Sequence, residues 1–193
     1  MAKLYFRYGT VSSAKTLNLL AVAHNYRQQN KRVLLFKPEI DTRFGRDVIK
    51  TRAGLEAEAD ALIPADGAFN APDLSGVVCV LVDEVQFAPA AVIDQLHAIA
   101  HETPRIPVIC YGLRTDFRRQ LFPASRRLLE LADSIEEIKT ICHFCLRKSV
   151  FNLKLLDGRP TLAGPTVELG AEEKYLPVCA NCYATQHEQR KAC

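Results

Sequence analysis

The sequence predicts an α/β fold: a parallel sheet flanked by helices, followed by a small C-terminal subdomain that binds a metal. Three observations carry this prediction. Near-continuous apolar runs, such as residues 77–82 (VVCVLV), are typical of parallel strands buried on both faces, and they alternate with helical patterns. A turn that resembles a phosphate loop joins the first strand to the first helix. Two Cys-x-x-Cys pairs lie near the end of the chain.

The elements of the larger part can be placed in order along the chain. Apolar-rich runs indicate the strands, and apolar residues at helical spacing, such as Val92, Leu96 and Ile99, indicate the helices. Residues 38–52 carry turn residues and mixed charges, so we expect a loop there. Strands are expected at residues 4–8, 33–37, 77–82, 108–113 and 134–139, and helices at residues 14–29, 90–102 and 123–132.

The pattern then changes, and we place a domain boundary between residues 1–139 and residues 140–193. The second part contains the cysteine pairs, a short strand expected at residues 150–156 and a loop with Gly and Pro at residues 157–165. Residues 186–191 are expected to form a solvated, frayed end. The chain is therefore predicted to fold as one α/β domain with a small appended subdomain.

Composition narrows the class of protein. The chain has 193 residues, 48% of them hydrophobic, which suits one domain with a small appendage. With 25 Lys and Arg against 22 Asp and Glu, the net charge of +3 argues against a nucleic-acid or membrane partner. No apolar run is long enough to cross a membrane and no signal peptide is recognisable, so we expect a cytoplasmic protein. The seven cysteines then favour metal binding, catalysis or burial over disulfides.

The turn after the first strand nearly matches the phosphate-loop motif GxxxxGK[ST]. In such a loop, backbone N–H groups and the helix N-terminus face phosphate oxygens. Lys15 is then expected to reach the β- and γ-phosphates of ATP, and the Thr16 hydroxyl to bind Mg²⁺. The predicted ATP-binding residues of this loop are Gly9, Thr10, Val11, Ser12, Ser13, Ala14, Lys15 and Thr16.

Ala14 departs from the motif, which has Gly at this position. A Cβ atom there is expected to crowd the phosphate or to strain the backbone. The competing interpretation is an ordinary strand, turn and helix with a helical lysine. The rest of the chain favours the phosphate loop.

Two adjacent acids, Asp83 and Glu84, follow the apolar run 77–82. Ligands bind at the carboxyl ends of parallel strands, so these acids are expected at the site. Asp83 is predicted to hold the Mg²⁺ shell, and Glu84 to accept the proton of an attacking hydroxyl. The charge of Asp83 and partial burial are expected to raise the pKa of Glu84. The alternative is that one or both acids cap the next helix.

The cysteine pairs predict a structural zinc site. Two Cys-x-x-Cys pairs supply four thiolates for one tetrahedral Zn²⁺ and leave no coordination position open for catalysis. The alternative, a redox-active Cys-x-x-Cys motif, is disfavoured because neither copy lies on a thioredoxin-like βαβ pattern. The predicted ligands are Cys142, Cys145, Cys179 and Cys182.

Six segments together carry a family resemblance that extends over essentially the whole chain. They read LYFRYGTVSSAKT, EIDTRFG, VLVDEVQF, CYGLRTDFRRQLF, KTICHFC and KYLPVCANC. In this order the chain resembles the thymidine kinases of the zinc-containing, tetrameric class. The resemblance implies a P-loop NTPase-like domain and a zinc-binding subdomain that carries a lasso loop.

The resemblance also implies roles for individual residues. Glu84 takes the position of the catalytic general base. The further residues expected near the nucleotide are Asp41, Thr42, Arg43, Asp83 and Gln86. The residues expected at thymidine are the aromatics Phe117 and Phe122, the lasso residues Thr166, Val167, Glu168, Leu169 and Gly170, and Tyr175. The four cysteines are expected to anchor both ends of the lasso through zinc.

The predicted activity is transfer of the γ-phosphoryl group of ATP, with Mg²⁺, to the 5′-hydroxyl of thymidine. The resemblance implies a homotetramer and feedback inhibition by thymidine triphosphate. Two alternatives stay open. One is a different acceptor, which makes the protein another nucleoside kinase or an NTPase. The other is a zinc-ribbon nucleic-acid-binding module with an inactive nucleotide site, for which the charge offers no support.

Overall fold

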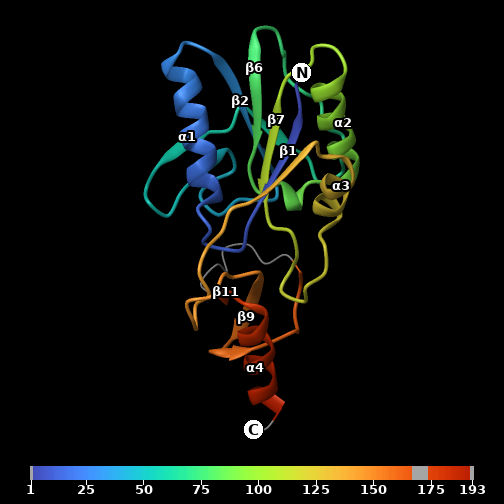
Figure 1. The fold of residues 1–193 in the computed structure, drawn as a ribbon. Coiled ribbons are helices and arrows are strands. Elements are labelled where there is room, and N and C mark those ends of the chain that lie inside the picture. The colour runs from blue at the N-terminus through green and yellow to red at the C-terminus, as the bar shows by residue number, and fades with distance from the viewer. Residues whose placement is uncertain (1, 167–173, 192–193) are drawn as a thin grey trace.

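The larger part of the protein is a six-stranded sheet with helices on both faces (Figure 1). The fold is that of a computed structural model in which residues 2–166 and 174–191 are described. The strand order is β5-β2-β6-β7-β1-β8, and every neighbouring pair is parallel. The first strand therefore lies inside the sheet, which places the loop that follows it over the sheet's carboxyl edge.

The predicted strands and helices of this part are confirmed, with ends that differ by one or two residues. The strands are β1 (Leu4–Tyr8), β2 (Arg32–Pro38), β6 (Val77–Val82), β7 (Val108–Gly112) and β8 (Ser134–Glu137). The helices are α1 (Lys15–Gln28), α2 (Ala90–His101) and α3 (Pro123–Leu131). A short strand, β5 (Ala61–Ile63), and a 3₁₀ turn, η1 (Val85–Phe87), had no counterpart in the prediction.

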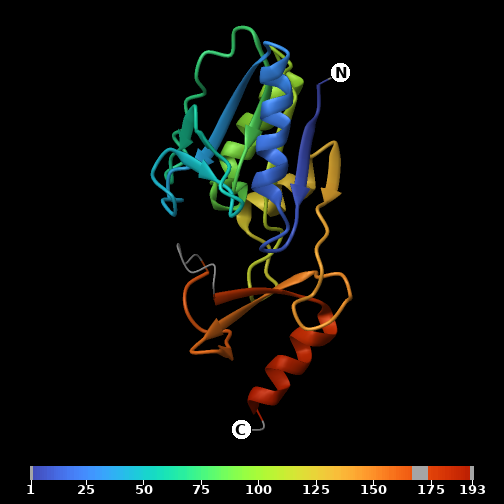
Figure 2. The ribbon, with the colours of Figure 1, turned by 90° about the vertical axis from the view of Figure 1, so that its left-hand side faces the viewer.

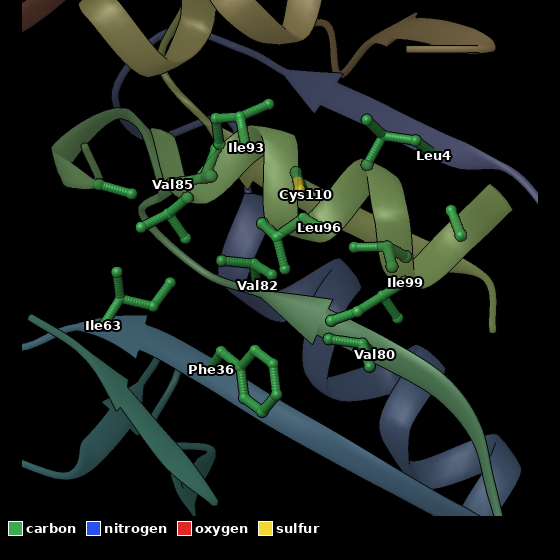
Figure 3. Packing of buried hydrophobic residues seen from close by; sticks show 14 of the residues in the cluster. Leu4, Phe36, Ile63, Val80, Val82, Val85, Ile93, Leu96, Ile99 and Cys110 are labelled. Atoms are coloured by element: carbon green, nitrogen blue, oxygen red, sulfur yellow. The ribbon is translucent and has the colours of Figure 1, made fainter. Parts of the chain in front are cut away.

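Two hydrophobic clusters hold the helices against the sheet. On one face, Ile93, Leu96 and Ile99 of α2 pack on sheet residues such as Val80 and Val82 (Figure 3). On the other face, α1 packs through Leu19, Leu20 and Ala23. Because β6 and β7 contribute to both clusters, their side chains are apolar on both faces, which explains why the sequence reads as unbroken apolar runs.

One part of the loop prediction for residues 38–52 is wrong. This stretch contains β3 (Val48–Lys50), which pairs antiparallel with β4 (Glu56–Glu58) in a hairpin. The strands have only three residues each, β4 is mostly polar, and Lys50 and Glu56 form an exposed ion pair across the hairpin. Ile49, which is buried against the α1 cluster, is the hairpin's main apolar anchor, so the apolar pattern gave no strand signal.

The C-terminal part has a small sheet and core of its own. The sheet consists of β10 (Arg159–Pro160), β9 (Phe151–Leu156) and β11 (Tyr175–Val178), and α4 (Ala180–Lys191) follows it. The prediction of a frayed end at residues 186–191 is wrong, because this segment continues α4. The loop expected at residues 157–165 contains the short strand β10.

The turn after β1 lies next to the C-terminal part (Figure 2), and hydrogen bonds join the two. The Val11 backbone N–H donates to Asn152 Oδ1 at 2.9 Å, and the hydroxyls of Thr10 and Ser149 lie 2.8 Å apart. Asn152 Nδ2 also donates to the Thr115 carbonyl at 3.4 Å. The turn between β1 and α1 is therefore held between the two parts of the protein.

The conformation of Ala14 leads to a stability prediction. Ala14 precedes α1 with φ 61° and ψ 28°, in the left-handed region. A side chain in this region costs about 1–2 kcal/mol, whereas Gly adopts it readily but adds about 0.4–1 kcal/mol of unfolded-chain entropy. We expect Ala14→Gly to raise the free energy of unfolding by roughly 0.5–1 kcal/mol, measured by urea denaturation.

The matched control is Ala91→Gly. Ala91 is exposed and lies in regular α2, so the same change should lower the free energy of unfolding by up to about 1 kcal/mol. A loss of stability in both variants contradicts the strain assigned to Ala14.

Candidate active site

A cavity of about 310 Å³ lies where the carboxyl edge of the sheet faces the C-terminal part. The segments that follow β1, β2, β6 and β7 all contribute to it, as expected for a parallel sheet. Many of the predicted site residues line this one cavity, although they are far apart in the sequence. They are Val11, Ser12, Ser13, Ala14, Lys15, Thr16, Arg43, Glu84, Gln86, Phe117, Phe122, Thr166 and Tyr175.

The other predicted site residues do not line the cavity. Gly9 and Thr10 are buried at the base of the turn, and Asp83 is buried behind Thr16. Asp41 lies behind Arg43, and the neighbouring Thr42 is exposed. The predicted lasso residues Val167, Glu168, Leu169 and Gly170 lie outside the described residues.

The turn after β1 closes around the amino group of Lys15. Lys15 Nζ donates to the Thr10 carbonyl at 2.7 Å and lies 3.4 Å from Ser13 Oγ. Burial lowers the pKa of Lys15, and the charges of Glu84 and Asp83 oppose that shift. Ser12 and Ala14 are both left-handed, at φ 58° and 61°. Left-handed residues in such a turn direct successive N–H groups into a concave surface that favours anions.

The two acids have different partners. Asp83 is buried and accepts a hydrogen bond from the Thr16 hydroxyl at 3.0 Å. Glu84 borders the cavity, forms an ion pair with Arg43 at 2.7 Å, and accepts a hydrogen bond from Gln86 Nε2 at 2.6 Å. Glu84 precedes η1 but its side chain makes no capping bond, and α2 also begins without a side-chain cap. The capping alternative is therefore wrong.

The predicted direction of the Glu84 pKa shift is also wrong. Burial acts to raise this pKa, but the charges of Arg43 and Lys15, with the hydrogen bonds from Arg43 and Gln86, outweigh burial and lower it. Burial and the charge of Glu84 instead raise the pKa of Asp83. Glu84 therefore stays ionised, and Asp83 is the member of the pair that binds a proton more readily.

Arg43 owes its position to a second carboxylate. Its Nε donates to Asp41 Oδ1 at 2.7 Å, while its Nη2 contacts Glu84. Asp41 also lies 3.6 Å from the buried Lys37 amino group, which donates to the Val48 carbonyl at 2.8 Å. Burial acts to lower the pKa of Arg43, but the negative charges and hydrogen bonds of Glu84 and Asp41 outweigh burial and raise this pKa. A permanent positive charge is thus fixed beside Glu84.

The opposite end of the cavity is aromatic. The Phe117 and Tyr175 ring centroids lie 6.1 Å apart, and Phe122 packs edge-on against Phe87 at 6.1 Å. Phe117 is almost fully buried and is one of the residues that line the cavity. A wall of this kind suits a flat, partly apolar ring.

The position of Arg118 could not be predicted from the sequence. In the structure, Arg118 holds the segment from Leu162 to Thr166 against the aromatic end of the cavity. Its guanidinium lies 4.5 Å from the Phe117 ring centroid and donates to the Leu162 carbonyl at 3.0 Å and the Thr166 hydroxyl at 2.9 Å. It also donates to the Gly164 carbonyl. These contacts join positions more than forty residues apart, for which the sequence carries no signal.

The four predicted metal ligands form one cluster. The Sγ atoms of Cys142, Cys145, Cys179 and Cys182 all lie within 4.8 Å of one another. Cys145 Sγ is 3.8 Å from Cys179 Sγ and 3.8 Å from Cys182 Sγ. Four thiolates at about 2.3 Å from a tetrahedral Zn²⁺ are separated by about 3.8 Å, so the cluster has the dimensions of a zinc site.

The cluster is linked to the aromatic end of the cavity through Tyr183. The Tyr183 hydroxyl, one residue beyond Cys182, donates to the Phe117 carbonyl at 2.6 Å. Tyr183 also belongs to the small hydrophobic core that contains the cysteines. The position of Phe117 therefore depends on the cysteine cluster.

Among the described helices, none combines the length and the apolar character needed to span a bilayer.

Comparison with known proteins identifies the family. The family model described as "Thymidine kinase" matches residues 2–183. A thymidine kinase of Chromobacterium violaceum is 46% identical over 184 residues, which cover 95% of this chain and 98% of that protein. Thymidine kinases of Lactococcus lactis and Enterococcus faecalis are 41% and 43% identical, each over 95% of this chain and 97% and 95% of those proteins. The chain belongs to the thymidine kinase family.

Proposed function

We propose that this protein transfers the γ-phosphoryl group of ATP to the 5′-hydroxyl of thymidine. One observation carries the proposal: Lys15 and Glu84 face the same cavity as Phe117, with a phosphate-loop turn at one end and an aromatic wall at the other. The cavity thus offers a cationic place for a triphosphate, an acceptor for a proton and a flat apolar surface for a base. Membership of the thymidine kinase family supports the same substrates.

At the phosphate end, the turn's N–H groups and Lys15 bind the phosphate oxygens. Thr16 and, behind it, Asp83 would hold Mg²⁺, because a hydroxyl and a carboxylate 3.0 Å apart offer the oxygen donors that this ion prefers. When bound, Mg²⁺ neutralises charge that develops on the β- and γ-phosphate oxygens. The side chains of Lys15 and Thr16 hold the donor in line with the acceptor.

At the reacting centre, Glu84 orients the 5′-hydroxyl and accepts its proton as the oxygen attacks phosphorus. Its low pKa makes Glu84 a weak base. In a loose transition state the 5′-hydroxyl loses its proton late. The orientation that Glu84 gives this hydroxyl therefore matters more than the basicity of Glu84. Arg43 fixes the carboxylate and places a positive charge beside the transferring group.

At the nucleoside end, thymine packs on Phe117 and Phe122, and Tyr175 lies near the sugar. The lasso residues 166–170 read the edge of the base. Arg118 holds the entry to this segment through Leu162 and Thr166. The four cysteines would hold Zn²⁺, which would supply a fixed anchor for both ends of the lasso and for Tyr183.

Further properties are proposed from the family resemblance and the composition. They are a homotetramer, inhibition by thymidine triphosphate, a cytoplasmic location and a boundary at residues 139/140. The net charge of +3 supports the absence of a nucleic-acid partner, and no observation favours the zinc-ribbon alternative.

The function is tested by phosphoryl transfer from [γ-³²P]ATP to a panel of nucleosides. We expect thymidine to be phosphorylated, and Glu84→Gln to lower turnover by ~10²–10⁴-fold with little loss of ATP binding. The matched control is Glu130→Gln, because Glu130 is an exposed residue of α3 that pairs only with nearby arginines. Turnover that is unchanged in Glu84→Gln refutes its role, and absence of thymidine phosphorylation in the wild-type protein refutes the function.

Asp83→Asn should separate stability from activity. Because the pKa of Asp83 is raised in the folded protein, its ionisation lowers the free energy of unfolding. This loss is absent at low pH, where Asp83 is protonated, and is complete once the pH exceeds the folded pKa of about 7. We expect the variant to gain roughly 1–3 kcal/mol of unfolding free energy at pH 8 and nothing near pH 4. It should also lose most Mg²⁺-dependent turnover. A variant that is less stable than wild type at pH 8 contradicts this assignment.

Removal of a metal ligand should act on thymidine more than on ATP. We expect the wild-type protein to contain one zinc ion per chain and Cys182→Ser to lose it, with a lower thermal midpoint. Because Tyr183 holds the Phe117 carbonyl, the KM for thymidine should rise roughly 5–10-fold, the effect of about one lost hydrogen bond. Wild-type protein that lacks zinc and is unaffected by chelation contradicts the structural zinc.

A further inference from the structure

The proposed reaction leaves one buried lysine of the sheet without a role. Lys37 is 1% exposed and lies near the end of β2, directly after Leu35 and Phe36, which are fully buried. A buried ammonium loses its hydration, so an apolar side chain fills a core position of this kind at lower cost. The charge of Lys37 therefore has to be explained by the groups that surround it.

The groups around Lys37 belong to the segment that follows β2. Lys37 Nζ donates to the carbonyls of Val48 at 2.8 Å and Gly45 at 3.3 Å. It also lies 3.6 Å from Asp41 Oδ2, in an ion pair. An ammonium has three N–H donors, and these three oxygens come from one short segment. The segment that carries Arg43 is thus folded around the Lys37 amino group.

Opposite charges alternate from Lys37 to the carboxylate at the reacting centre. Asp41 accepts hydrogen bonds from Arg43 Nε at 2.7 Å and from Arg43 Nη2 at 3.1 Å. The same Nη2 lies 2.7 Å from Glu84 Oε1. The four side chains are at most 14% exposed, so solvent screens their charges little. Two cations and two carboxylates balance one another within this row.

The balance of charge decides which carboxylate holds the shared nitrogen of Arg43. Asp41 Oδ2 faces both Lys37 and Arg43 Nη2, so Lys37 offsets part of the negative charge that acts on Nη2. Without the charge of Lys37, Asp41 and Glu84 compete for a single guanidinium. Asp41 already binds two nitrogens of that guanidinium, and it is therefore expected to draw Nη2 away from Glu84.

We propose that Lys37 is a positioning residue for phosphoryl transfer, whose ammonium offsets the charge of Asp41 and so leaves the Arg43 guanidinium on Glu84. This inference rests on the proposed function, in which Glu84 orients the acceptor hydroxyl. Neither Lys37 nor Asp41 lines the cavity, so both act through Arg43 and not on a substrate. A charge buried behind the site then controls the geometry of the carboxylate inside it.

The test compares steady-state kinetics of the wild type, Lys37→Met, Asp41→Asn and the double variant. Lys37→Met keeps the length of the side chain and removes its charge. We expect its kcat to fall ~10–100-fold, the effect of a small displacement at the reacting centre, with the KM for thymidine and the Kd for ATP within about twofold of wild type. Because Lys37 acts through Asp41, the double variant should lose no more turnover than Asp41→Asn.

The matched control is Val92→Ala, which truncates a fully buried residue of the α2 cluster and leaves the charges around Glu84 unaltered. It should lower the thermal midpoint and leave kcat unchanged. An unchanged kcat in Lys37→Met overturns the proposal. So does a double variant whose loss of turnover is the product of the two single losses, or a Val92→Ala variant that loses as much turnover as Lys37→Met.

A structural measurement separates this inference from the proposed function. In crystal structures of the wild type and Lys37→Met, we expect the distance between Arg43 Nη2 and Glu84 Oε1 to lengthen beyond about 3.5 Å in the variant. An unchanged distance overturns the role of Lys37 even if the wild type phosphorylates thymidine. If the wild type does not phosphorylate thymidine, the proposed function fails, and this distance still decides whether Lys37 positions Arg43.

Discussion

Two adjacent carboxylates, Asp83 and Glu84, must be kept together at the end of a strand that is buried on both faces. Much of the surrounding structure meets this constraint. The Thr16 hydroxyl binds Asp83, and Arg43 and Gln86 bind Glu84. These partners come from the start of α1, the segment after β2 and the turn after β6, so the acid pair ties three separate loops into one site.

The aromatic end of the cavity is organised from the C-terminal part. Four hydrogen bonds, made by Ser149, Asn152 and Tyr183, cross to the turn after β1 and to the segment after β7. The cysteine cluster therefore supports more than its own small core. Because zinc sites stabilise structure that a small hydrophobic core cannot, a metal bound at this cluster would help to hold the aromatic wall of the cavity.

The sequence predicted the buried sheet accurately because strands covered on both faces must be apolar, and such runs are visible without structural knowledge. The spacing of the two Cys-x-x-Cys pairs also predicted the cysteine cluster, and the family resemblance predicted the cavity-lining aromatics. The prediction missed the β3–β4 hairpin, whose strands have only three residues each, and the helix α4. It gave the wrong direction for the Glu84 pKa, since the approach of Arg43 arises only on folding. For the same reason, the position of Arg118 could not be predicted.

The left-handed backbone at Ala14 bears on how phosphate loops are recognised. Its carbonyl accepts the first hydrogen bond of α1 from the Asn18 N–H at 3.0 Å, and the next residue, Lys15, is pinned to the Thr10 carbonyl. These two contacts thus fix the left-handed conformation at Ala14, and the side chain of Ala14 contributes little to it. A motif search that requires glycine before the lysine does not detect this chain. The backbone at Ala14 nevertheless adopts the left-handed conformation for which that glycine is normally selected.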